Sequence, residues 1–337
     1  MNAWKRLRKC SICGHNGFCT ISGDGEVVKC MRTPSPRPIK HTDGSVGYLH
    51  PTPTGEAARA KSLPSSKDVP RLTIPAVKAL MKQHRSAINP MRLKRLSESL
   101  GVSERALKAF GIGWDTTTGC WSFPMYDGEI RPIGLRLRRD DGRKLCVPGS
   151  RNGLFIPENY APVAIPDGVF ADGSTAPWLL VMPEGPTDAA AAFDIGFNAI
   201  GRPNNCGGAD LIRKLLSTGC KQEVIVVADH DETKWRDVID MKTHITSQEA
   251  YWPGIEGALS LCEQILPACG TLQFALPPDD AKDLRKWVQT NGVGAWRKNG
   301  LEGTIVTRAW IAAARERLEK KRRTALWERA RTQRKAG

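Results

Sequence analysis

Four acidic residues stand just beyond apolar stretches of the chain, where their carboxylates could act together. The apolar stretches span 178–182, 224–228 and 272–276. The acidic residues that follow them are Glu184, then Asp229 and Asp231, and finally Asp283. Carboxylates that meet in one place repel one another unless a divalent cation neutralises them, and such oxygen ligands suit Mg²⁺ or Mn²⁺. The pattern predicts a metal site capable of phosphoryl chemistry.

A parallel sheet would bring these carboxylates to one edge. The apolar stretches alternate with helical patterns at 187–193 and 255–266, which is typical of an α/β fold. The carboxyl ends of parallel strands share the edge at which the active sites of such folds lie. A simpler interpretation makes Asp188 and Asp231 helix caps. Glu184, between a proline and a glycine, caps nothing obvious.

A second set of chemically capable residues lies near the N-terminus. Cys10 and Cys13 form a Cys-x-x-Cys pair, and Cys19 and Cys30 follow. Four thiolates at this spacing predict a tetrahedral zinc site with a structural role, with His15 as a competitor for one position. About thirty residues need such a staple to fold. A redox Cys-x-x-Cys pair is the alternative, but the βαβ context typical of it is missing.

Composition limits the class of protein. The 337 residues carry 50 Lys and Arg against 35 Asp and Glu, a net charge of +15, and 40% are hydrophobic. The apolar fraction excludes a wholly disordered chain, and no apolar run approaches the roughly 20 residues of a membrane span. No secretory signal is recognised, so we expect a cytoplasmic protein without a membrane partner. The positive excess is typical of proteins that bind a polyanion, most often nucleic acid, but it also fits a solubilising surface, and charge alone does not decide between them.

The sequence divides into segments of different character. Residues 33–70 contain seven prolines with Ser, Thr and Gly clusters, which predicts a tether. Helical and then strand-like patterns follow, and the chain ends in a basic helical stretch. The expected segments are a zinc-binding, zinc-ribbon-like module at 1–32, a flexible linker at 33–70, a small α+β subdomain at 71–170, an α/β domain with a parallel sheet at 171–295, and a basic C-terminal helix at 296–337.

One predicted strand carries alternating basic residues. In the stretch 133–138, three apolar side chains would face one way and Arg136 and Arg138 the other. Such a row fits a solvated strand face or a groove for a nucleic-acid template. Lys144 follows after a turn.

Glu184-Gly185-Pro186-Thr187-Asp188, followed by Asp229-His230-Asp231, resembles the TOPRIM domain that bacterial-type primases share with type IA and II topoisomerases and some nucleases. Together with the four-cysteine finger and the stretches 134–150 and 197–203, the chain resembles phage and mobile-element primases over about residues 8–295.

The resemblance implies a DNA primase that makes short RNA primers on single-stranded DNA from ribonucleoside triphosphates. Glu184, Asp229 and Asp231 match the catalytic metal-site positions for Mg²⁺ or Mn²⁺, with Asp283 as a further ligand. The expected nucleic-acid or nucleotide contacts are Arg136, Arg138, Lys144, Arg202 and Lys282. A separate replicative helicase is an expected partner, and the source would be a bacterial cell, a phage or a mobile element.

Two other functions remain open. The same carboxylates could position water in a metal-dependent nuclease. One large class of TOPRIM nucleases carries an ATPase module, but this sequence has no Gly-Lys dipeptide and therefore no P-loop. Alternatively, the protein could be a non-catalytic zinc-finger DNA-binding protein. The basic helix at the C-terminus could dock a helicase, grip DNA or fray in solvent.

Overall fold

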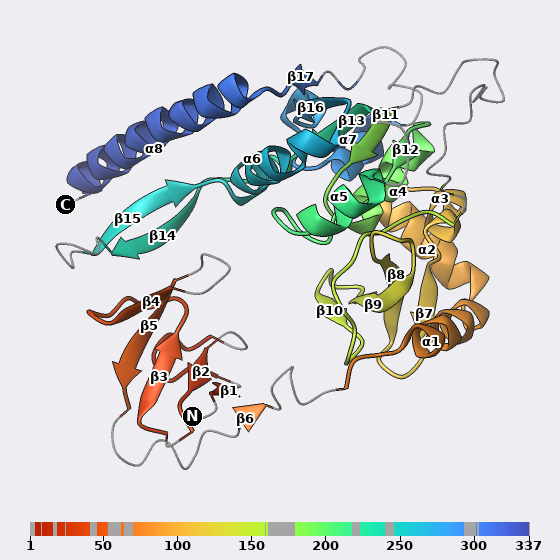
Figure 1. Ribbon diagram of the computed structural model, residues 1–337, viewed down its shortest axis with the longest axis horizontal. Helices are drawn as coiled ribbons and strands as arrows, with labels where there is room; N and C mark the ends of the chain where they lie inside the picture. Colours follow the sequence, from red (N-terminus) through yellow and green to blue (C-terminus); the bar gives the residue numbers. More distant parts are fainter. Residues whose placement is uncertain are drawn as a thin grey trace. The chain divides into compact units, whose positions relative to one another are not determined.

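The chain folds as a mixed α/β protein with two compact units. The computed structural model describes residues 4–7, 9–15, 19–23, 25–40, 46–52, 62–63, 70–158, 160, 179–217, 223–239, 246–292, 301 and 303–336 (Figure 1). One unit comprises Met1–Pro70, Thr233–Tyr251 and Arg322–Gly337, and the other comprises Arg71–Glu232 and Trp252–Lys321. Among the helices described, none has the length and apolar character that crossing a membrane requires.

An antiparallel sheet surrounds the cysteines in the first unit. Its order is β4-β5-β3-β2-β1-β6. The strands are β1 (Lys5–Leu7), β2 (Thr20–Ile21), β3 (Val27–Cys30), β4 (Pro38–Lys40), β5 (Val46–Pro51) and β6 (Ser62–Leu63). Leu7, Ile21 and Val28 are buried beside the cysteines and form a small core.

The predicted boundary between zinc module and linker differs from the structure. Strands β4 and β5 lie within the stretch expected to be a flexible tether, yet β5 pairs with β3 along four residues. Tyr48 on β5 is buried. The prolines suggested a linker, but an edge strand tolerates proline. Pro38 opens β4, which lies at the edge of the sheet and, among the described strands, pairs only with β5.

The same unit contains a hairpin that the sequence patterns did not predict. Strand β14 (Lys234–Ile239) pairs with β15 (Thr246–Tyr251) in an antiparallel ribbon. The last part of helix α8 (Arg308–Ala336) belongs to this unit too. The expected C-terminal helix is therefore present.

Three short helices open the second unit, each with an N-cap side chain. They are α1 (Ile74–Ser86), α2 (Pro90–Leu100) and α3 (Glu104–Ala109), capped by Thr73, Asn89 and Ser103. Gly101 closes α2, since it adopts the left-handed conformation with a φ of 64° that glycine tolerates best.

An antiparallel sheet follows, with the order β10-β9-β8-β7. Its strands are β7 (Gly113–Asp115), β8 (Cys120–Tyr126), β9 (Pro132–Arg138) and β10 (Lys144–Cys146). Arg138 pairs with Trp121 on one side and Lys144 on the other, so these side chains share a face of the sheet.

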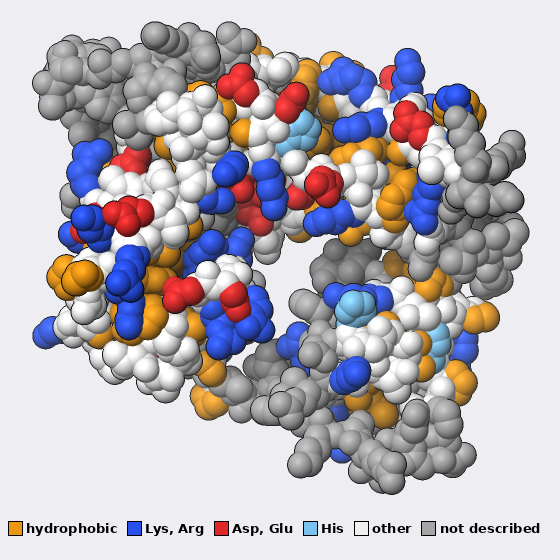
Figure 2. All heavy atoms as spheres, turned by 180° about the vertical axis from the view of Figure 1, so that it is seen from behind, with side chains coloured by type: hydrophobic (Ala, Val, Ile, Leu, Met, Phe, Trp, Pro, Cys, Tyr) orange, Lys and Arg blue, Asp and Glu red, His pale blue; other side chains and the backbone are white. Residues whose placement is uncertain are grey.

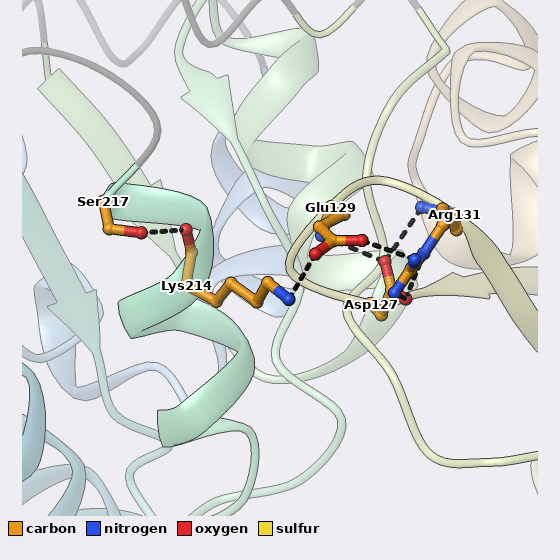
Figure 3. A network of polar contacts seen from close by, with 5 residues as sticks. All are labelled: Asp127, Glu129, Arg131, Lys214 and Ser217. Carbon is orange, nitrogen blue, oxygen red and sulfur yellow. Dashed lines mark hydrogen bonds and ion pairs between the residues drawn. The ribbon is translucent and has the colours of Figure 1, made fainter.

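A network of ion pairs joins the turn between β8 and β9 to the neighbouring α/β sheet. Arg131 contacts Asp127 at 2.8 Å and also contacts Glu129, whose carboxylate in turn contacts Lys214 on helix α5 (Ala209–Leu216) (Figure 3). Gly128 permits this approach, because a Cβ there would lie 2.6 Å from the carbonyl oxygen of Leu211. The basic strand β9 is thereby held against the domain that carries the carboxylates.

The α/β domain has the predicted parallel sheet. Its order is β12-β11-β13-β16-β17, and every pairing is parallel except that of β17. The strands are β11 (Leu179–Met182), β12 (Asn198–Ala199), β13 (Glu223–Val227), β16 (Thr271–Ala275) and β17 (Thr304–Ile305). The helices are α4 (Gly185–Asp194), α5 (Ala209–Leu216), α6 (Pro253–Ile265) and α7 (Leu284–Asn291), with 3₁₀ turns at Leu266–Ala268 and Pro278–Asp280.

Basic side chains are spread over the surface. Figure 2 shows Lys and Arg on many elements of the face drawn, with Asp and Glu among them.

Candidate active site and metal centre

Glu184 and Asp229 stand at the carboxyl ends of two paired parallel strands. Glu184 follows β11 and occupies the N-cap position of α4, yet its side chain makes no capping hydrogen bond. Asp229 lies just beyond β13, the direct neighbour of β11 in the sheet. The predicted convergence of these two acids at one sheet edge is present in the structure.

Arg202 joins the carboxyl ends of β11 and β13 from inside the protein. Its side chain is fully buried, and it donates hydrogen bonds to the carbonyl oxygens of Met182 at 3.1 Å and Val227 at 2.7 Å. A third bond of 2.6 Å goes to the carbonyl oxygen of Asn205. The charges of Glu184 and Asp229 favour its protonated form, although burial lowers its pKa.

The resemblance implied that Arg202 contacts nucleic acid or nucleotide, but its side chain is buried and cannot reach such a ligand. Its neighbour Gly201 allows the chain to pass close to the start of α4, since a Cβ there would lie 2.4 Å from the carbonyl oxygen of Gly185. Arg202 is therefore a positioning residue for the carboxylates.

The acids of this edge act on one another electrostatically. Burial raises the pKa of Asp229 to about 8, and the negative charges of Asp188, Glu184 and Asp283 add to the shift while Arg202 opposes it. Three other carboxylates thus lie close enough to Asp229 to affect its ionisation. Without a compensating cation, its ionised form is disfavoured at neutral pH.

Asp188 belongs to this group, although its position also fitted a helix cap. It is buried in the first turn of α4, and burial followed by the charge of Asp283 raises its pKa. Its Oδ1 accepts a hydrogen bond of 3.0 Å from the backbone N–H of Arg285. The spacing of four residues from Glu184, one helical turn, was the signal for this role.

The other two predicted ligands make capping bonds. Asp231 accepts a hydrogen bond of 2.9 Å from the backbone N–H of Gly254 in the first turn of α6. Asp283 caps α7 through a bond of 2.7 Å from the backbone N–H of Lys286, and lies 3.6 Å from the guanidinium of Arg285. Asp231 therefore contacts the start of α6 from another part of the chain, since the N-cap residue of that helix is Trp252.

The basic residues of β9 are half-buried rather than solvated. Burial lowers the pKa of Arg138, as does the charge of Arg285, while Asp188 and Asp283 raise it. Lys144 on the next strand is exposed and its charge lowers the pKa of Asp188. These cations therefore lie within electrostatic reach of the carboxylates.

Arg136 also faces the α/β domain. Its Nη2 donates to Asn152 Oδ1 at 3.1 Å and to the carbonyl oxygen of Pro203 at 3.4 Å. Its Nε is buried, with no hydrogen-bond partner among the described residues. Lys282 is exposed, and its carbonyl oxygen accepts a bond of 2.7 Å from the N–H of His230.

The four cysteines form a compact cluster suited to a metal ion. Their sulfur atoms all lie within 4.8 Å of one another, and in the described part of the chain no other trio of potential ligands gathers this closely. The separations of 3.8 Å between Cys13 and Cys19 and 3.9 Å between Cys19 and Cys30 match tetrahedral zinc with bonds of about 2.3 Å. His15 stands outside this cluster.

Backbone N–H groups surround the sulfur of Cys30. Burial alone would raise its pKa, but N–H groups of Thr33 at 3.2 Å and Arg32 at 3.4 Å outweigh this and lower it. Such donors stabilise a thiolate. The donor set therefore fits a structural zinc ion.

The carboxylates form a looser group whose chemistry fits a hard divalent cation. Oxygen ligands that repel one another in a partly buried site are what Mg²⁺ or Mn²⁺ neutralises.

Neither a family model nor a curated protein matches the sequence. Among solved structures, the chain is similar to a DnaG primase catalytic domain bound to ssDNA, at 19% identity, covering 68% of this chain and 78% of that chain with a TM-score of 0.46. It is also similar to the zinc-binding and RNA polymerase domains of Aquifex aeolicus primase, at 14% identity, 93% and 82% coverage and a TM-score of 0.47. A third similar structure is the primase fragment of the bacteriophage T7 primase-helicase. It shares 14% identity, the match covers 86% of this chain and 96% of that chain, and the TM-score is 0.38. Likeness at this level assigns no activity, so function is argued from the site.

Proposed function

We propose that the protein is a DNA primase that joins ribonucleotides on a single-stranded DNA template. The observation that carries the proposal is the position of Glu184 and Asp229 at the carboxyl ends of the paired parallel strands β11 and β13. Burial and the neighbouring acids raise the pKa of Asp229 to about 8, and a divalent cation would offset this. The TOPRIM-like order of these acids along the chain supports the same conclusion. A zinc unit upstream is consistent with template binding.

Glu184, Asp229, Asp188 and Asp283 would hold Mg²⁺ or Mn²⁺, and Asp231, in the loop after β13, would complete the set. Such ions would supply positive charge for activating a 3′-hydroxyl and for stabilising the pyrophosphate that leaves. Arg202 keeps the ends of β11 and β13 in register so that the carboxylates stay in place.

The basic face beside the carboxylates would orient the substrates. Arg136, Arg138 and Lys144 lie on one face of the β8–β9–β10 sheet, and their charges suit a triphosphate or a template backbone. Lys282, exposed next to Asp283, provides a further cation. Alignment and charge stabilisation supply most of the rate gain in phosphoryl transfer.

The test is synthesis on single-stranded DNA with labelled ribonucleotides and Mg²⁺ or Mn²⁺. We expect short ribo-oligomers from the wild-type protein and a loss of about a hundredfold or more in Asp229→Asn. Asp210→Asn is the matched control, because Asp210 is an exposed acid on α5 paired with Arg213. Shortened DNA instead of new oligomers would indicate a nuclease, and DNA binding without either product would indicate a non-catalytic protein.

A further inference from the structure

The hairpin β14–β15 holds the last turns of α8 by two arginines. Arg322 donates from Nε to the carbonyl oxygen of Ala250 at 3.2 Å and lies 3.1 Å from the carboxylate of Glu249. Arg329 places its guanidinium 4.2 Å from the ring centre of Trp235. The two elements run side by side in Figure 1. This end of the helix is therefore docked and does not simply fray in solvent.

Docking on one side fixes which side chains point the other way. Arg322 and Arg329 are seven residues apart and share a helix face, as does the half-buried Ala325. Arg323, Trp327 and Arg331 recur at a spacing of four and lie on the opposite face. All three are exposed.

The outward face combines positive charge with an exposed aromatic ring. Trp327 is 63% exposed, and the guanidinium of Arg331 lies 5.4 Å from its ring centre. Residues 322–332 contain four arginines and one acidic residue, Glu328. Most of the Trp327 ring is therefore open to solvent, on the side of the helix away from the hairpin.

We propose that Arg323, Trp327 and Arg331 form a binding stripe for single-stranded nucleic acid. Arginines at both ends suit phosphates, and an exposed indole between them suits an unpaired base. At 1.5 Å per residue, the stripe is about 12 Å long, roughly the length of three stacked nucleotides. An acidic protein could also bury the ring, so the test below measures binding to nucleic acid directly. The inference concerns binding and does not depend on the reaction proposed above.

The test measures binding of the full-length chain to fluorescein-labelled oligothymidylate by fluorescence anisotropy over a series of salt concentrations, with no added Mg²⁺ or nucleotides. In Arg323→Ala/Arg331→Ala, we expect the slope of log K against log salt to become shallower by about 1.4, because two phosphate contacts are lost. The control Lys94→Ala/Lys108→Ala removes two exposed charges from α2 and α3 and should leave the slope unchanged.

The aromatic contribution is tested separately. Trp327→Ala should weaken binding roughly fivefold to a hundredfold, whereas Trp327→Phe should recover most of the affinity because a ring remains to stack. Circular dichroism checks that the helix is retained. Wild-type affinity and slope in both the arginine and the Trp327→Ala variants would overturn the proposal and favour an acidic protein partner. An equal loss on duplex DNA would overturn the choice of a single strand.

Loss of primer synthesis in Asp229→Asn with an unchanged anisotropy curve would separate the two proposals. The stripe would then stand on its own, whatever chemistry the carboxylate site performs.

Discussion

Arg202 determines the geometry of the candidate site without reaching its surface. Its guanidinium donates to carbonyl oxygens at the ends of β11 and β13, the two strands that carry Glu184 and Asp229. A buried cation would be costly if unpaired, but here the carbonyl oxygens and the neighbouring carboxylates compensate it. The same side chain thus supports the fold and holds the carboxylates of Glu184 and Asp229 close to each other.

Replacing Arg202 should therefore destabilise the second unit strongly. Arg202→Met removes the cation and leaves three carbonyl oxygens and two acids without it, so we expect a loss of about 3–5 kcal/mol in the free energy of unfolding. Urea unfolding followed by circular dichroism measures this. Arg202→Lys keeps the charge but loses the forked donors of the guanidinium, so its free energy of unfolding should lie between those of the wild type and Arg202→Met. A loss below about 1 kcal/mol for Arg202→Met would contradict the assigned role.

His84 gives the second unit a stability that depends on pH. The ring is buried, with Nδ1 3.0 Å from Ser122 Oγ and Nε2 3.8 Å from Asp115. Burial lowers its pKa from the ordinary 6.5, and the charge of Asp115 opposes this only in part. As the pH falls, the unfolded chain takes up the proton first.

The contribution of His84 is therefore fully present above pH 6.5 and is lost as the pH falls through that value towards the folded-state pKa. We expect His84→Gln to flatten the decline in unfolding free energy between about pH 7.5 and pH 5 relative to the wild type. Asp115 titrates below this window, since its pKa is lowered from 3.8. Parallel pH profiles for wild type and variant would show that the assignment is wrong.

At the scale of elements, the cysteine cluster links strands that bury little apolar surface by themselves. Leu7, Ile21 and Val28 are the buried aliphatic side chains beside it. A core of this size cannot offset the conformational entropy of the chain, so metal binding must supply the difference.

Cys13→Ser should therefore reduce bound zinc well below one ion per chain and unfold the sheet of β1–β6, because structural zinc contributes about 10–16 kcal/mol to folding in comparable modules. Elemental analysis and the chemical shifts of the β3 and β5 amides measure the two effects. Cys206→Ser, which changes an exposed free thiol, is the matched control. Stoichiometric zinc and normal primer synthesis in Cys13→Ser would refute the prediction.

At the scale of the whole molecule, the two units have separate cores. The core around the cysteines shares no residue with the two larger clusters of the second unit. Units with independent cores unfold independently unless a large interface couples them.

We therefore expect two transitions in calorimetry, and a zinc chelator should abolish the one that belongs to the cysteine-containing unit while leaving the other near its original temperature. The Arg202→Met variant provides the reverse control, because it should lower the second transition alone. One transition that moves as a whole in both experiments would indicate a single cooperative unit.

The sequence by itself determined the elements and the order of chemical groups along the chain. Apolar runs followed by acids predicted the strands β11, β13 and β16. Their bounds agree with the prediction within one residue, and their parallel pairing is confirmed. The Cys-x-x-Cys spacing predicted the cysteine cluster. These signals are local, since strand composition and ligand spacing are set by neighbouring residues.

The tertiary structure decided which side chains meet. It placed Asp188 among the carboxylates, gave Asp231 a capping bond and buried Arg202 beneath the site. The tertiary structure also pairs β5, from a segment predicted to be a linker, with β3, and it packs the basic helix against a hairpin that was not predicted. Burial and electrostatic coupling depend on residues distant in the chain, so a local pattern carries no record of them.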